Sequence, residues 1–144
     1  MCPSSPWKTE GARVFGVVGG DAREPRVFFL KQLLTPSKEL EDKLNGAAPE
    51  EVFRVAAPCA GAGCGHHNTQ TKGCNLVEKI VVGVDPVVDA YAVCLIRSTC
   101  VWWEQEGVKA CVRCPQIATR NKLQSEQVAL ASDPRSPVEL RRSA

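Results

Sequence analysis

The chain has 144 residues, with 18 Lys and Arg against 16 Asp and Glu, so its formal net charge is +2. This length fits one domain with a tail, and a charge so close to neutral argues against a general nucleic-acid-binding surface. The 44% apolar content is ordinary for a globular protein, and a domain of this size buries a core without needing staples to fold.

Residues 1–12 are rich in Pro, Ser, Gly and charged residues, and they predict a flexible leader. They lack the apolar stretch of a signal peptide, and no apolar run in the chain approaches the ~18 residues of a membrane span. The sequence therefore predicts a cytoplasmic protein with no membrane partner. In a reducing cytosol, clustered cysteines more often bind metal or carry out redox chemistry, whereas a disulfide framework belongs to secreted proteins.

The segment 13–57 predicts the α+β part of the domain. Two runs rich in Val and Phe, 13–18 and 26–31, are separated by turn residues and predict an antiparallel hairpin. The stretch 35–46 opens with Thr-Pro-Ser and closes with Asn-Gly, which are signals for the start and the end of a helix. A further short element begins at Pro49 and leads into the first cysteine cluster.

The segment 58–119 is cysteine-rich and predicted to be mainly helical. Residues 76–84 are apolar and β-branched, which suits either a strand or a buried helix. A helix is expected to begin at Asp85-Pro86 and run towards Cys94. Two short helices are expected over 98–106 and 108–114, broken at the glycine between them.

The last part of the chain, residues 125–144, is polar and predicts a mobile tail or a segment that orders on a partner. The predicted fold is therefore α+β, with one metal-binding domain over residues 13–124. A small N-terminal β-hairpin or sheet packs on helices, and a helical, cysteine-rich C-terminal half holds the metal.

Four cysteines in the second half of the chain have the spacing C-x5-C-x10-C-x2-C-P and are Cys94, Cys100, Cys111 and Cys114. Zinc folds usually hold the ion between two tight pairs of ligands, and only Cys111 and Cys114 form such a pair here. A [4Fe–4S] cluster has four iron corners and accepts ligands from several loops and short helices. The loose spacing therefore favours an iron–sulfur cluster, with zinc and metal-free cysteines as the alternatives.

The fragment Cys111-Val-Arg-Cys114-Pro115 resembles the end of the cysteine run of bacterial ferredoxins, C-x2-C-x2-C-x3-C-P. The resemblance implies iron–sulfur ligation by these two cysteines. The upstream ferredoxin spacing is absent, so the resemblance implies neither the ferredoxin fold nor its potential.

Bulky and basic residues lie among these four cysteines. Trp102 and Trp103 would keep water away from cluster sulfurs, or they are ordinary packing residues. Arg97, Lys109 and Arg113 would favour a cluster of net negative charge, or they are solvated surface residues.

An earlier group of soft ligands contains Cys59, Cys64, His66, His67 and Cys74. Three cysteines with one histidine are a known zinc set, and they can also hold an iron–sulfur cluster. The two histidines are adjacent, so their side chains diverge and only one of them is expected to bind the metal. The alternative is a flexible glycine-rich loop with surface histidines. Cys2, in the leader, is expected to be unligated.

The function predicted from these patterns is a small cytoplasmic iron–sulfur protein that holds one or two [4Fe–4S] clusters and transfers electrons or senses redox state. Its expected partner is an unidentified redox protein. The alternatives are a zinc-stabilised module that binds protein or nucleic acid, with the basic stretch 135–142 as a contact, and a small metalloenzyme with an open coordination site.

Overall fold

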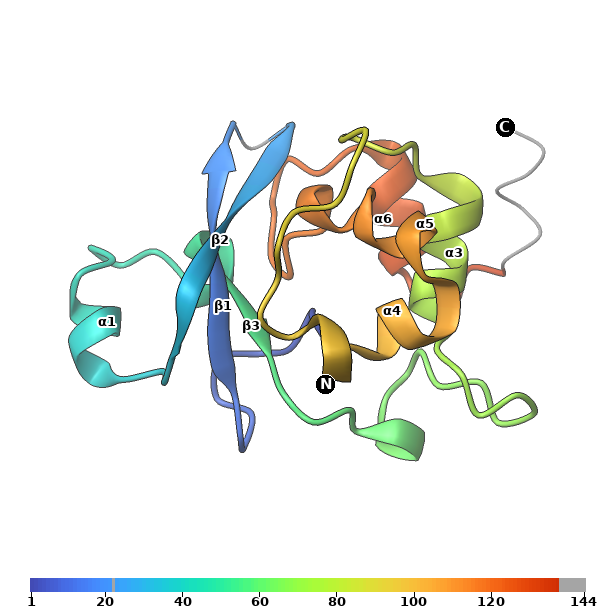
Figure 1. The fold of residues 1–144 in the computed structure, drawn as a ribbon, viewed down its shortest axis with the longest axis horizontal. Helices are drawn as coiled ribbons and strands as arrows, with labels where there is room; N and C mark the ends of the chain where they lie inside the picture. Colours follow the sequence, from blue (N-terminus) through green and yellow to red (C-terminus); the bar gives the residue numbers. More distant parts are fainter. Residues whose placement is uncertain (22, 138–144) are drawn as a thin grey trace.

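A three-stranded antiparallel sheet lies beside a group of short helices (Figure 1). The computed structural model describes residues 1–21 and 23–137. The strands are β1 (Arg13–Gly20), β2 (Pro25–Leu34) and β3 (Phe53–Ala56), in the order β2-β1-β3. The helices are α1 (Lys38–Asp42), α2 (Pro49–Val52), α3 (Asn75–Gly83), α4 (Val101–Glu106), α5 (Val108–Cys111) and α6 (Glu126–Ser132). Short 3₁₀ turns are η1 (Gly61–Gly63), η2 (Arg97–Thr99) and η3 (Cys114–Gln116). The predicted α+β class and the hairpin are confirmed.

The register of the sheet shifts between Val14 and Gly16 in β1. Gly16 is required there because a Cβ atom would lie 2.4 Å from Cγ1 of Val27. The shift leaves Phe15 between the two paired positions, and this ring is buried against the helices. One face of the sheet thereby contributes an aromatic side chain to the main core.

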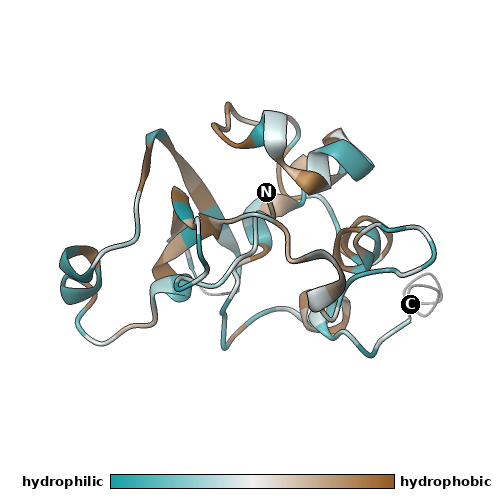
Figure 2. Cartoon of the chain, turned by 90° about the horizontal axis from the view of Figure 1, so that it is seen from below, coloured by the Kyte–Doolittle hydropathy of each residue, from teal (hydrophilic) through white to brown (hydrophobic). Residues whose placement is uncertain are grey.

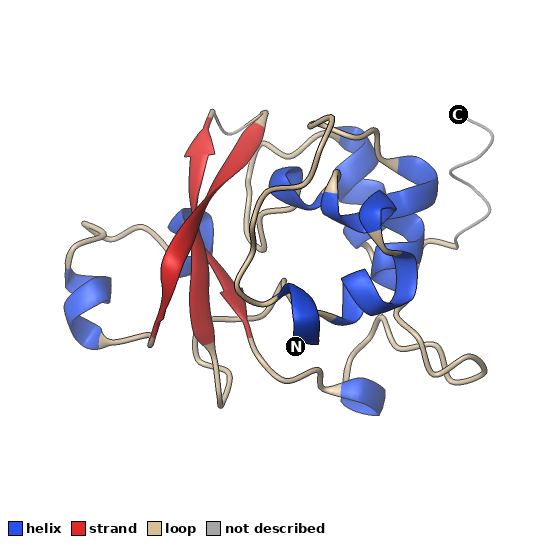
Figure 3. Cartoon of the chain, viewed as in Figure 1, coloured by secondary structure: helices blue, strands red, loops and turns tan. Residues whose placement is uncertain are grey.

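The two faces of the sheet are covered by different parts of the chain. Phe15 and Ala56 on one face join the main core with α3, α4 and α6. Val14 and Val55 on the other face join a smaller core with Trp7 from the N-terminal segment. Figure 3 shows α3 to α6 together on one side of the strands and α1 beyond the other side. Apolar residues are concentrated in the strands and the packed helices, whereas α1 is hydrophilic (Figure 2).

The N-terminal segment, for which the sequence predicted a flexible leader over 1–12, is packed along the sheet. Cys2 forms an antiparallel bridge with Ala57, and the N–H of Ser5 donates to the carbonyl of Val55 at 3.0 Å. Trp7 stacks on Phe53 with ring centroids 5.5 Å apart. These contacts extend β3 with an added strand-like segment and fix the position of residue 2.

Several elements expected after residue 58 take their predicted form, and one does not. The apolar stretch 76–84, which fitted a strand or a helix, is the helix α3. Gly107, with φ of 63°, separates α4 from α5 as expected.

The helix expected from Asp85 towards Cys94 is absent, and this prediction was wrong. The segment 84–95 is irregular instead, with bends and a turn, and runs between the sheet and the helices (Figure 1). Its alternate residues Val88, Ala90, Ala92 and Cys94 line one cavity, which is the period of an extended chain rather than a helix.

Residues 125–144 were predicted to form a mobile tail. In the structure, Ser125 caps α6 by accepting a hydrogen bond from the N–H of Val128 at 3.2 Å. Val128 and Ala131 are buried against α3. The last part of the predicted tail, residues 138–144, lies outside the described residues. Within the described part of the chain, no helix is long and apolar enough to cross a membrane.

Truncating the buried contact of α6 tests whether this helix is part of the folded domain. Val128→Ala is expected to lower the free energy of unfolding by about 2 kcal/mol, because it removes buried apolar atoms and leaves a cavity. Leu130→Ala is the matched control, since Leu130 is 39% exposed on the same helix. Denaturant unfolding of the two variants measures the difference. Equal, small effects would contradict the docking of α6.

Candidate metal centres

The cysteines Cys94, Cys100, Cys111 and Cys114 line one cavity of about 130 Å³ between the sheet and the helices. This volume holds several water-sized groups, which is more than one ion needs. The structure therefore brings together the four residues that the sequence grouped as one site. Burial raises the pKa of the thiols of Cys94, Cys100 and Cys111, so these groups are neutral unless a metal displaces their protons.

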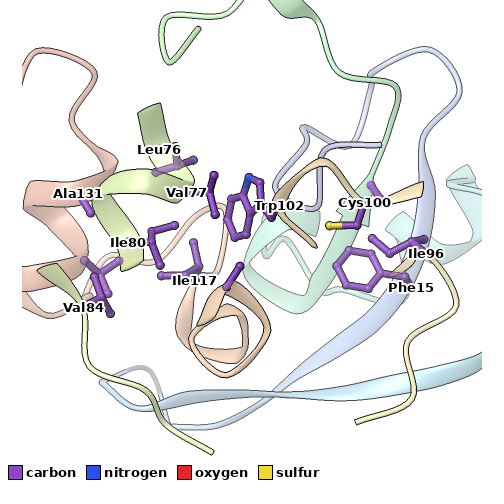
Figure 4. Packing of buried hydrophobic residues seen from close by; sticks show 13 residues of the cluster. Phe15, Leu76, Val77, Ile80, Val84, Ile96, Cys100, Trp102, Ile117 and Ala131 are labelled. Carbon is purple, nitrogen blue, oxygen red and sulfur yellow. The ribbon is translucent and has the colours of Figure 1, made fainter. Parts of the chain in front are cut away.

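Short helical turns set the positions of the four thiols. Cys100 is the residue before α4, Cys111 ends α5, and Cys114 begins η3. Cys94 lies near the end of the irregular segment 84–95, where its carbonyl accepts a hydrogen bond from the N–H of Arg97. Figure 4 shows Cys100 inside the main core, with its sulfur directed inward beside Phe15, Ile96 and Trp102. The surroundings of this cavity are largely apolar, which excludes water.

A buried arginine from the sheet reaches this site. Arg54, on β3, is 0% exposed, and its Nη2 donates to the sulfur of Cys114 at 3.1 Å. Its guanidinium also donates to the carbonyls of Cys114 at 2.6 Å and Pro3 at 3.1 Å, and it lies 5.4 Å from the centroid of the Phe15 ring. The three hydrogen-bond acceptors of Arg54 are two backbone carbonyls and one thiol sulfur, and none of them is a carboxylate. These hydrogen bonds therefore do not neutralise the charge of the guanidinium.

Two other arginines, Arg26 and Arg97, line this cavity. The guanidinium of Arg97 lies 4.5 Å from the ring centroid of Tyr91 and 5.6 Å from that of Trp103. Its positive charge and a side-chain hydrogen bond oppose the rise that burial causes in the pKa of Cys111. Arg54 and Arg97 thus place positive charge beside Cys114 and Cys111, and this arrangement suits an occupant of net negative charge.

The earlier group of ligands lines a second cavity of about 420 Å³. Cys59, Cys64 and Cys74 line this cavity, and so do both His66 and His67. Cys74 is held by Gln105 on α4, whose side chain accepts from the Cys74 N–H at 2.8 Å and donates to the Cys74 carbonyl at 3.1 Å. Cys2, which the sequence analysis left unligated, lines the same cavity.

The two histidines have different surroundings. His67 forms an antiparallel bridge with Cys74, so its backbone helps to position that ligand. Burial lowers the pKa of His66, the positive charge of Lys79 lowers it further, and Asp133 acts in the opposite direction. Its Nδ1 is buried and has no hydrogen-bond partner among the described residues. His66 also lines the cavity.

Three cysteine sulfurs accept hydrogen bonds from N–H groups, and nearby N–H groups act to lower the pKa of the other five thiols. The N–H of Gly61 donates to the sulfur of Cys59 and that of His66 to the sulfur of Cys64, both at 3.4 Å. The side chain of Arg54 donates to the sulfur of Cys114, and that of Arg97 acts to lower the pKa of Cys111. For the other four sulfurs, burial raises the pKa and nearby backbone N–H groups oppose this rise. The N–H of Ser4 acts on Cys2, and those of Leu76 and Val77 act on Cys74. The N–H of Ile96 acts on Cys94, and those of Trp102 and Trp103 act on Cys100.

All eight cysteines are free thiols in the structure. Within residues 1–21 and 23–137, no three His, Cys, Asp or Glu side chains converge closely enough to hold one metal ion. The thiols are instead distributed round the walls of two cavities.

Sequence reasoning missed Cys2 and Arg54. Cys2 is followed by Pro3, as Cys114 is followed by Pro115, and eight cysteines are enough for two four-thiolate sites. These two signals pointed to Cys2. Nothing in the sequence pattern distinguished Arg54 from an ordinary surface arginine of a strand.

No protein-family model matches this chain, and neither a curated protein nor a solved structure matches it.

Proposed function

We propose that this protein binds iron–sulfur clusters and transfers single electrons, with a [4Fe–4S] cluster held by Cys94, Cys100, Cys111 and Cys114. The observation that carries the proposal is the set of N–H donors at the cysteine sulfurs. A neutral thiol is only a weak hydrogen-bond acceptor, whereas a metal-bound thiolate accepts strongly. These donors are therefore suited to thiolates, and hydrogen bonds to sulfur also tune the potential of a cluster.

The charges near the cavity lined by Cys94, Cys100, Cys111 and Cys114 also support an iron–sulfur cluster as its occupant. A buried cation without a counter-charge is costly. Four thiolates and an iron–sulfur core carry net negative charge and would offset the charge of Arg54 and Arg97. The volume of about 130 Å³ and the distribution of the thiols round its wall favour a group with several metal corners over one ion.

The two cavities share a wall, and this feature supports electron transfer. Cys2 and Ser4 line the larger cavity while Pro3 lines the smaller one. In the same way Val101 faces the larger cavity, and its neighbours Cys100 and Trp102 face the smaller one. The N–H of Val101 donates to the carbonyl of Met1 at 2.9 Å, which joins the two segments. Groups bound in the two cavities would be separated by one thickness of polypeptide.

A cytoplasmic location is part of this proposal. Eight free thiols suit a reducing compartment, where thiols persist and exchange with metal. The partner that supplies or takes the electron is proposed to be another redox protein. The cavity lined by Cys94, Cys100, Cys111 and Cys114 is largely apolar, whereas a substrate site needs a few polar groups.

Metal and sulfide analysis of protein purified without oxygen from iron-replete cells tests the proposal. We expect about four iron atoms with an equal amount of acid-labile sulfide for each filled cavity, and therefore up to about eight of each per chain. Protein from iron-depleted cells is the control and is expected to lose iron and sulfide together. Stoichiometric zinc without sulfide, from iron-replete cells, would contradict the proposal and support a zinc-stabilised module.

A further inference from the structure

The N-terminal segment places a cysteine in the larger cavity by backbone pairing. The N–H of Cys2 donates to the carbonyl of Ala57 at 2.7 Å, and the N–H of Ala57 donates to the carbonyl of Cys2 at 3.3 Å. The hydroxyl of Ser5 also donates to the Cys2 carbonyl, at 2.9 Å. Since Ala57 lies two residues before Cys59, this pairing brings the first and second cysteines of the chain to the same place.

The thiol of Cys2 shares a cavity with the three other cysteines of this group. Cys2, Cys59, Cys64 and Cys74 all line the cavity of about 420 Å³. The electrostatic influence of Cys59 and Cys64 on Cys2, and of Cys2 on Cys74, agrees with this placement.

His66 is the competing fourth ligand, because its Nδ1 is buried without a hydrogen-bond partner among the described residues. His66 and Cys2 both line the cavity, so these two residues are the alternatives for the fourth ligand. The backbone pairing of Cys2 with Ala57, two residues before Cys59, favours Cys2.

We infer that Cys2 completes a second four-thiolate iron–sulfur site with Cys59, Cys64 and Cys74. This inference rests on the proposed function and reverses the expectation that Cys2 is unligated. It makes the two sites alike, since each contains one Cys-Pro pair, Cys2-Pro3 or Cys114-Pro115. Arg54 joins these pairs by donating to the carbonyls of Pro3 and Cys114.

Iron and sulfide content after anaerobic purification tests the inference in the full-length chain. Cys2→Ala is expected to lower the iron content of the parent, about eight atoms, by between one atom, for a cluster with an open corner, and about four, for a lost cluster. Ser4→Ala is the matched control, because Ser4 lies on the same segment and lines the same cavity. It is expected to keep the parental iron content.

Alkylation of the unaltered protein gives a second measurement that does not depend on how a variant folds. In the iron-loaded chain, Cys2 is expected to resist a maleimide probe as fully as Cys59, Cys64 and Cys74. After a chelator and an oxidant remove the cluster, followed by reduction, all four are expected to label. Mass spectrometry of the peptides identifies the labelled positions.

The outcomes separate this inference from the proposed function. Full iron and sulfide in Cys2→Ala, or labelling of Cys2 while the other three thiols stay protected, would overturn the inference. Loss of iron in His66→Ala but not in Cys2→Ala would replace Cys2 with the imidazole. A parent with about four iron atoms that depend only on Cys94, Cys100, Cys111 and Cys114 would keep the proposed function and overturn the inference. A parent without sulfide would defeat both.

Discussion

Replacing Arg54 with Met is expected to lower the free energy of unfolding of the iron-loaded protein by about 3–5 kcal/mol, the cost of removing one partner from a buried charge pair. The change leaves the carbonyls of Pro3 and Cys114 without their donor in a buried place, and each unpaired group costs about 1–3 kcal/mol. It also removes the cation beside the proposed cluster. Denaturant unfolding under anaerobic conditions, followed by iron analysis, measures both effects.

Two further variants at this position separate charge from hydrogen bonding. Arg54→Lys keeps the positive charge but cannot reproduce the planar fork, so it is expected to lose stability while retaining more iron than the Met variant. Arg54→Gln keeps donors without the charge. Its cluster is expected to have a more negative midpoint potential, because the cation stabilises the reduced, more negative state. A Met variant with parental stability and iron content would contradict the role given to Arg54.

Cys111→Ser and Cys114→Ser are each expected to disrupt the proposed cluster of the smaller cavity and to destabilise the short helices α4 and α5. Metal binding contributes folding free energy, of the order of 10 kcal/mol for structural zinc sites. Because Cys111 ends α5 and Cys114 begins η3, loss of the cluster also releases the short elements that it holds together. Hydrogen exchange, read beside iron analysis, is expected to show faster exchange in α4 and α5 than in the sheet.

The matched control for these changes is Cys59→Ser, which alters the other cavity. It is expected to leave the iron of the smaller cavity in place, so α5 and η3 should stay protected from exchange. Identical loss of protection in all three variants would show that the two sites are not independent. Parental iron content in both Cys111→Ser and Cys114→Ser would remove the smaller cavity from the proposal.

Local pattern determined much of the secondary structure. The Val- and Phe-rich runs with a glycine turn gave the hairpin of β1 and β2, because strand propensity and turn chemistry act over a few residues. Ser37 caps α1, and Gly107 separates α4 from α5, for the same local reason. Local pattern was misleading at Asp85-Pro86, where the signal for a helix start is followed by an irregular segment along the cavity wall.

Cysteine spacing grouped the candidate ligands, but tertiary structure decided which groups lie together. The sequence brought Cys94, Cys100, Cys111 and Cys114 into one set because they are close in the chain. It could not place Cys2 beside Cys59, which is far along the chain, since that contact depends on the pairing of the N-terminal segment with Ala57. It could not place Arg54 either, because a buried cation next to a thiol is decided by which face of the sheet the helices cover. Long-range pairing and burial are properties of the whole fold, and no short stretch of sequence carries them.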